Sequence, residues 1–79
     1  MGAVEAITAA MHRHLGSARV QEHACGAMYA LISSNKANKT RARRVGAQAL
    51  TISALKAHPG NKRVFKEARN LMEHIIKGE

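Results

Sequence analysis

The sequence contains one pattern twice. The stretch HLGSARVQEHACGAM, residues 14–28, returns 44 residues later as HPGNKRVFKEARNLM, residues 58–72. At this offset and without gaps, the identical pairs include Gly2/Gly46, Ala3/Ala47, Ala10/Ala54, His14/His58, Gly16/Gly60, Arg19/Arg63, Val20/Val64, Ala24/Ala68 and Met28/Met72. Helical units of this length cannot bury their apolar faces alone and stack on neighbours. The duplication therefore restricts the chain to stacked helical units.

Apolar spacing and capping residues predict five helices, one of them short. Val4, Ile7 and Met11 recur at helical intervals and predict a helix over 3–14. Ser17 is a suitable N-cap for a helix over 18–33, and Asn61 for one over 62–76. Helices over 39–45 and 47–57 lie between them, and no stretch alternates strictly enough to predict a strand.

The same spacing predicts which side of each long helix is buried. In the second helix the predicted stripe is Val20, Ala24, Ala27, Met28, Leu31 and Ile32. In the last helix it is Val64, Ala68, Leu71, Met72, Ile75 and Ile76, with Phe65 at its flank.

The length of the chain limits its core. A domain of 79 residues buries only about 60% of its unfolded surface, so its own stability is marginal. We therefore expect this chain to need neighbouring repeats or subunits. It is either part of a longer array, a self-associating unit, or a small structural subunit of a larger assembly.

A single cysteine, Cys25, rules out an internal disulfide and indicates an intracellular, reducing compartment. No apolar run approaches the roughly 18 residues of a membrane span. The N-terminus lacks the basic region of a signal peptide.

The charge is strongly positive and unevenly placed. The formal net charge is +8, and no carboxylate occurs between Glu22 and Glu67. Such a field attracts acidic partners. The predicted basic partner-binding patch consists of Lys36, Lys39, Arg41, Arg43, Arg44, Lys62, Arg63 and Lys66.

The repeated unit resembles the armadillo family of helical repeats. GAVEAITAAMHRHLGSARVQEHACGAMYALI is similar to the second and third helices of an armadillo repeat, and HPGNKRVFKEARNLMEHI to the same turn and third helix again. NKTRARRVG stands where the short first helix of the second repeat belongs. The resemblance implies a single all-α domain over 1–79, a right-handed α-solenoid segment of about one and two-thirds repeats. Residues 1–35 would be the last two helices of one repeat, and 36–79 the next repeat.

In armadillo proteins the last helix of each repeat lines a groove. The resemblance places six residues of this chain there: His23, Gly26, Ala30, Glu67, Asn70 and His74. The Trp–Asn pair, one turn apart, that grips extended peptides in the nuclear-import members of the family is present in neither repeat. The small residues Gly26 and Ala30 would instead admit a partner helix.

The sequence offers no chemistry for catalysis or cofactor binding. Cys25 lies on an apolar helix face, which favours a buried and inert thiol. No cysteine or carboxylate is spaced so that it completes a plausible metal site with any of the five histidines. We therefore expect a non-enzymatic protein-interaction or scaffold element without metal or cofactor, whose basic linker contacts an acidic or helical protein partner. The alternative is a basic accessory subunit of a ribonucleoprotein that contacts RNA phosphates.

Overall fold

The computed structural model describes residues 2–77 and confirms an all-helical fold of five helices over that range. They are α1 (Ala3–Arg13), α2 (Ala18–Ile32), α3 (Lys36–Arg44), α4 (Ala47–Ala57) and α5 (Lys62–Ile76). Met1 and residues 78–79, which the sequence assigned to the two repeats, lie outside the described range. No described helix has both the length and the apolar character that crossing a membrane requires.

The two predicted units have matching helices. α1 and α4 each contain 11 residues, and α2 and α5 each contain 15. The predicted N-caps are confirmed: Ser17 Oγ accepts a hydrogen bond from the Val20 N–H at 3.2 Å, and Asn61 Oδ1 accepts one from the Val64 N–H at 3.0 Å. Each cap satisfies a backbone donor that the first turn leaves unpaired.

The short helix begins three residues earlier than predicted. Asn35 Oδ1 accepts a hydrogen bond from the Asn38 N–H at 2.9 Å and so acts as an N-cap, which starts α3 at Lys36. The helix predicted over 39–45 left residues 36–38 outside it. A capping side chain supplies the start signal.

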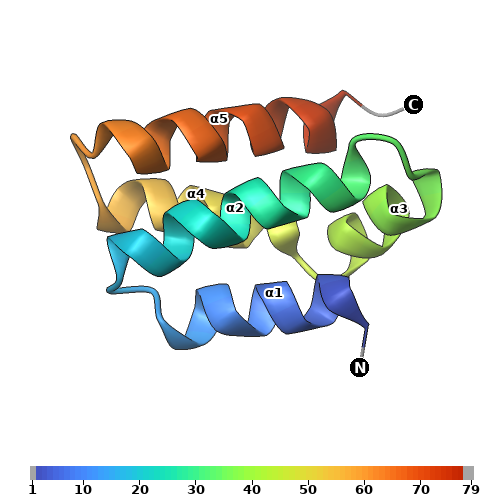
Figure 1. Ribbon diagram of the computed structural model, residues 1–79, viewed down its shortest axis with the longest axis horizontal. Helices are drawn as coiled ribbons and strands as arrows, with labels where there is room; N and C mark the ends of the chain where they lie inside the picture. The colour runs from blue at the N-terminus through green and yellow to red at the C-terminus, as the bar shows by residue number, and fades with distance from the viewer. Residues whose placement is uncertain (1, 78–79) are drawn as a thin grey trace.

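The helices form two layers (Figure 1). α2 and α5 lie side by side, run in the same direction and make the most extensive helix–helix contact. α1 packs against α2, α4 packs against α5, and α1 and α4 also contact each other. The core lies between the layers and is filled by apolar residues that include Val4, Met11, Cys25, Met28, Ile32, Leu71 and Ile75.

α3 crosses the far end of both layers and is fixed there by hydrogen bonds and charge (Figure 1). The Arg43 Nε–H donates to the Ile75 carbonyl oxygen at 2.9 Å, and Asn38 Nδ2 donates to the Leu31 carbonyl oxygen at 3.0 Å. Arg41 forms an ion pair with Glu5 at 3.6 Å. α3 therefore connects the last turns of α2 and α5 with the first turn of α1.

A glycine makes the sharp connection between α3 and α4 possible. Gly46 has a φ of +85°, a left-handed conformation that side chains with a β-carbon rarely adopt. Gly60, in the turn before α5, has a φ of +81°. These turns return the chain so that α5 can lie parallel to α2.

Gln21 joins α1 to α2 from within the core. Its side chain is fully buried, and its Nε2 donates to the carbonyl oxygens of Met11 at 3.1 Å and His14 at 2.9 Å. These carbonyls lie at the C-terminal end of α1, where helical partners run out. A polar residue in the first turn of α2 thus completes the hydrogen bonding of the preceding helix.

The predicted buried stripes need correction. Ala27 is exposed, and Ile76 is 63% exposed although both were predicted to be buried. Phe65, predicted at the flank, is 56% exposed. Gln21 of α2, which was not part of the predicted stripe, is fully buried, as is Cys25. The buried face of α2 is rotated relative to the predicted stripe, because apolar residues cover more than one face of this helix. The buried residues of α5, Val64, Ala68, Leu71 and Ile75, all belong to its predicted stripe.

A Gln21→Glu variant should be destabilised by roughly 3 kcal/mol near neutral pH, because a carboxylate would face two carbonyl oxygens in the core. Protonation restores a donor, so the folded state raises the pKa of this new acid. The loss should therefore shrink as the pH falls through that pKa. Urea unfolding at several pH values measures it.

The matched control is Gln48→Glu, the same chemical change at an exposed position in the first turn of α4. It should change stability by less than about 0.5 kcal/mol. Equal unfolding midpoints for the two variants would show that the hydrogen bonds of Gln21 contribute nothing.

Candidate functional site

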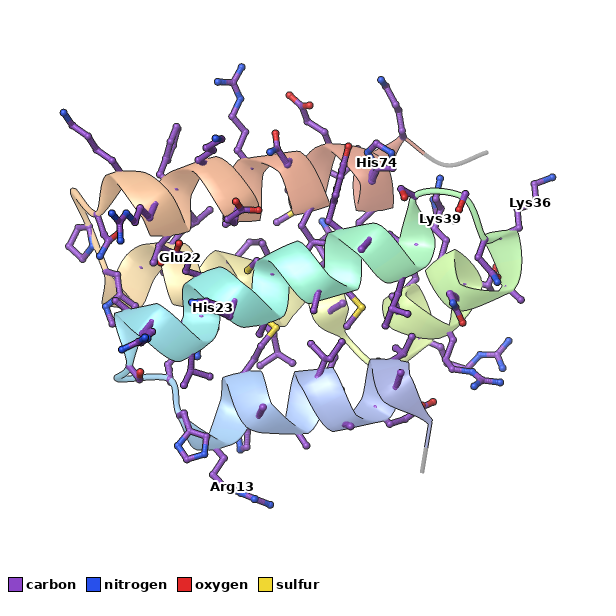
Figure 2. The ribbon with its side chains drawn as sticks, viewed as in Figure 1. Arg13, Glu22, His23, Lys36, Lys39 and His74 are labelled. Atoms are coloured by element: carbon purple, nitrogen blue, oxygen red, sulfur yellow. The ribbon has the colours of Figure 1, made fainter. Side chains whose placement is uncertain are left out.

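The six residues that the resemblance assigned to a groove lie along the seam between α2 and α5. His23, Gly26 and Ala30 come from α2, and Glu67, Asn70 and His74 come from α5. Figure 2 shows His23 on α2 and His74 near the far end of α5. The Tyr29 and His74 rings meet edge to face, with centroids 4.7 Å apart, and so close the seam at that end. We call these six residues the α2–α5 row.

Gly26 shapes the middle of the row. A β-carbon at this position would lie 3.3 Å from Glu67 Oε1, so the missing side chain gives the Glu67 carboxylate room against the α2 backbone. Ala30, one turn further on, is exposed and carries only a methyl group. The α2 side of the row is therefore low, while the α5 side carries the longer polar side chains of Glu67, Asn70 and His74.

A polar hollow of about 440 Å³ opens where α2 and α5 begin. Its walls include Arg19, Glu22 and His23 from α2, with Asn61 and Arg63 from the start of α5. The prediction named Arg63 but missed Arg19. The signal for it was present, since Arg19 and Arg63 are an identical pair of the repeat. Two exposed guanidinium groups border one hollow, next to the row.

The structure divides the predicted basic patch into two clusters. Lys62, Arg63 and Lys66 lie at the start of α5 beside the polar hollow. The other five lie on α3, which packs near the opposite end of α5 (Figure 1): Lys36, Lys39, Arg41, Arg43 and Arg44.

The α3 cluster is partly engaged within the molecule. Arg41 pairs with Glu5, and Arg43 donates to Ile75, so both help to hold α3 in place. Lys36 and Arg44 are exposed, and Lys36 projects from the tip of α3 in Figure 2. The cluster at the start of α5, beside the row, is the better candidate for contact with a partner.

Cys25 lies beneath the row and is fully buried, as predicted. Burial, reinforced by the nearby negative charge of Glu67, raises the pKa of the Cys25 thiol to about 11. A thiol that stays protonated and covered from solvent is a poor nucleophile. Its contribution here is packing in the core.

Over residues 2–77, no three His, Cys, Asp or Glu side chains come together in a way that could hold a metal ion. The histidines are dispersed: His23 and His74 belong to the row, and His58 contacts the turn after α1. The chemistry that the row and hollow offer is hydrogen bonding and charge attraction.

Comparison with protein-family models, with curated proteins and with solved structures finds no match to this chain. The armadillo resemblance therefore rests on the residues of this sequence alone.

We predict that the Cys25 thiol reacts slowly with a thiol reagent at mildly alkaline pH, about 100-fold more slowly than in the urea-unfolded chain. Glu67→Gln removes the neighbouring negative charge and should raise the rate severalfold. Glu22→Gln, the same change on the outer part of α2, is the control and should leave the rate unchanged. Equal rates in folded and unfolded protein would contradict the buried position.

The same pKa shift makes stability depend on pH. Because the pKa of Cys25 is higher in the folded chain than its ordinary value of 9.0, its contribution is complete below pH 9 and is lost as the pH rises toward 11. Urea unfolding across this range, compared with a Cys25→Ala variant in which that slope is absent, measures the effect.

Proposed function

We propose that this chain is an armadillo-like repeat segment, part of a right-handed α-solenoid, and that it acts as a non-catalytic protein-interaction element in a reducing intracellular compartment. The α2–α5 row is its binding surface. Arg19, Arg63 and the lysines at the start of α5 attract an acidic helical segment of a partner protein.

The observation that carries this proposal is the partly exposed seam between two parallel helices, with arginines at one end. His23, Gly26 and Ala30 repeat at the same helical positions as Glu67, Asn70 and His74, so the row continues from one helix to the next. Short residues on α2 leave space for a partner backbone, and Glu67, Asn70 and His74 supply donors and acceptors beside it. A surface of this shape suits a helix laid along it.

Charge supports an acidic partner over a neutral one. Arg19 and Arg63 are both exposed at the polar hollow, and Lys62 and Lys66 flank Arg63 on α5. Glu22 and Glu67 are the acids on this side, and Glu67 lies partly buried against Gly26. The field at the N-terminal end of the row is therefore positive, which accelerates encounter with acidic surfaces.

The parallel arrangement of α2 and α5 supports the solenoid assignment. Units stacked by translation place equivalent helices side by side and in the same direction. The matched lengths of α1 with α4 and of α2 with α5 agree with such stacking. So does the position of α3 between the two units in the chain.

The test uses a labelled acidic helical peptide of about 16 residues, long enough to form a helix on binding. We expect binding that weakens as the salt rises above about 0.1 M, because the arginines are exposed. Amide chemical shifts should move along the α2–α5 row and around Arg19 and Arg63. The double variant Arg19→Glu/Arg63→Glu should lose about tenfold or more in affinity.

The matched control is Arg13→Glu/Lys36→Glu, which changes the net charge equally at two exposed residues that Figure 2 shows away from the row. It should weaken binding much less. If the two double variants lost equal affinity for the peptide, binding would depend on net charge alone, which would contradict a defined binding surface. A short single-stranded RNA that binds more tightly than the peptide, with shifts centred on α3, would favour the ribonucleoprotein alternative instead.

A further inference from the structure

The first unit consists of α1 and α2, and the second of α4 and α5. One sequence offset aligns their helix boundaries, and a different offset aligns most of their buried residues. Their helix boundaries and caps correspond at 44 residues. Four of the five buried residues of α2 correspond to buried residues of α5 at 43, in the pairs Gln21/Val64, Cys25/Ala68, Met28/Leu71 and Ile32/Ile75. The fifth, Ala24, corresponds at 44 to the buried Ala68. The same shift relates the buried Val4, Thr8 and Met11 of α1 to Ala47, Thr51 and Ala54 of α4.

A shift of one residue rotates the buried face of a helix by about 100°. Two units related by a two-fold axis would bury equivalent residues, because such a contact is made by the same patch on both sides. The units of this chain bury different faces. The two units therefore contact each other through faces that are not equivalent in the repeat.

Each unit consequently carries a second apolar face, turned away from the core. On the second unit it contains the counterparts of the residues that the first unit buries. Ile52, Phe65 and Ile76, the counterparts of Thr8, Gln21 and Ile32, are 39%, 56% and 63% exposed. Phe65 and Ile76, together with Leu55 and Met72, border a hollow of about 530 Å³. Ile52 lies one turn before Leu55 on α4. We call this surface the α4–α5 face.

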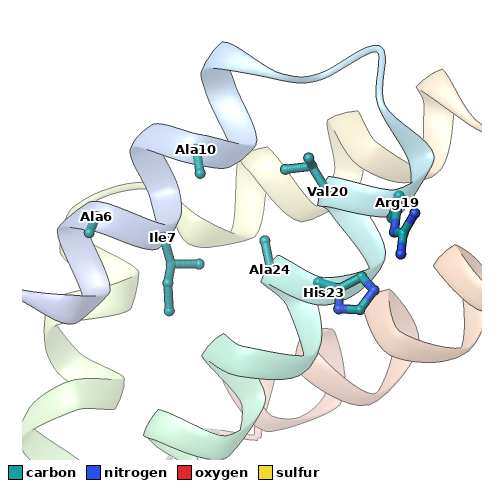
Figure 3. Close-up of a pocket in the computed structure, with 7 residues that line it drawn as sticks. All are labelled: Ala6, Ile7, Ala10, Arg19, Val20, His23 and Ala24. Atoms are coloured by element: carbon teal, nitrogen blue, oxygen red, sulfur yellow. The ribbon is translucent and has the colours of Figure 1, made fainter.

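The second unit packs against the first through the buried residues of α4 and α5. The seven residues 44 positions earlier, on α1 and α2, contribute to the outer surface of the first unit. Four of these seven counterparts are identical in the two units: Ala3, Ala10, Val20 and Ala24 correspond to the buried Ala47, Ala54, Val64 and Ala68. Ala3, Ala10 and Val20 are exposed or partly exposed, whereas Ala24 is only 8% exposed and also belongs to the core. Ala10, Val20 and Ala24 line, with Ile7, a hollow of about 510 Å³ between α1 and α2, shown in Figure 3. We call this surface the α1–α2 face.

The repeated histidine supplies a second, polar match. In the second unit the ring N–H of His58 at Nε2 donates to the Leu15 carbonyl oxygen in the turn of the first unit, at 2.8 Å. Its counterpart His14 is exposed, and so is Pro59, the counterpart of Leu15. A unit stacked beyond the α4–α5 face would place its own His14 beside that Pro59 carbonyl.

We propose that a second copy of this chain stacks head to tail on the first, with the α4–α5 face of one copy against the α1–α2 face of the next. The contact inside the chain is the template. Phe65, Met72 and Ile76 are the bulky residues of one face, and Ala6, Ala10 and Val20 form the shallow surface that receives them. Because the two faces differ, the contact leaves one face open at each end of the stack.

The first experiment is sedimentation of the chain from about 5 μM to about 500 μM. We expect the average mass to rise with concentration beyond that of a dimer, as an open-ended contact requires. Phe65→Glu blocks the α4–α5 face, and Ala10→Glu blocks the α1–α2 face. Each variant alone should associate at least about tenfold more weakly than the original chain.

The decisive experiment mixes the two variants. Each retains the face that the other has lost, so the mixture should form a one-to-one dimer and nothing larger. His14→Ala should weaken association of the otherwise unchanged chain. Thr40→Glu, on the exposed side of α3, adds the same charge as Phe65→Glu and Ala10→Glu and is their control, which should have no effect on association. Circular dichroism of every variant establishes that its helices are formed. Ala6→Glu, at an exposed position of the same hollow, replaces Ala10→Glu if that variant unfolds.

Three results would overturn the proposal. One is a chain that stays monomeric over the whole concentration range. Another is an Ala10→Glu variant that dimerises as well as the original chain, which indicates a two-fold contact between α4–α5 faces. The third is a mixture of the two variants that remains monomeric.

Discussion

The contact between α2 and α5 is the interaction on which the rest of this molecule depends. Two parallel neighbouring helices cannot be joined by a short turn, because the chain must first return to the end where it started. α3 and α4 provide that return, and the left-handed glycines at 46 and 60 make its corners. α1 and α4 then cover the inner side of the pair and complete a core that is thin and largely aliphatic.

The candidate binding surface is the outer side of the same contact. Glu67 lies over the bare backbone at Gly26, and Cys25 lies just below with its pKa raised by burial and by that carboxylate. The residues proposed to hold a partner are therefore fixed by the packing that holds the protein together. Their positions do not depend on a loop, which lowers the entropy lost when a partner is bound.

Sequence reasoning predicted the elements better than their orientation. Ser17 and Asn61 cap helices because a short polar side chain before an apolar run has one favoured use, and that signal is local. Which face of α2 is buried is not local. Apolar residues surround much of the helix, so the sequence predicted that both Ala27 and Cys25 are buried. Only the packing of the other helices decides that Cys25 is buried and Ala27 is not. All five basic residues of α3 were assigned to a partner, but two of them, Arg41 and Arg43, reach Glu5 and Ile75 of their own chain. The armadillo relationship and the solenoid remain predictions.

The position of α3 has a consequence for the order in which an assembly of these chains would come apart. Inside one chain, α3 crosses the junction between the two units and is tied to both, through Asn38 to the end of α2 and through Arg43 to the end of α5. A junction between two copies has the apolar faces but lacks a covalent connection, so dilution opens it and leaves the chain intact. In such an assembly, weak contacts between copies alternate with strong contacts inside each chain. The protein concentration therefore sets the length of the assembly but does not affect the folded chain from which it is built.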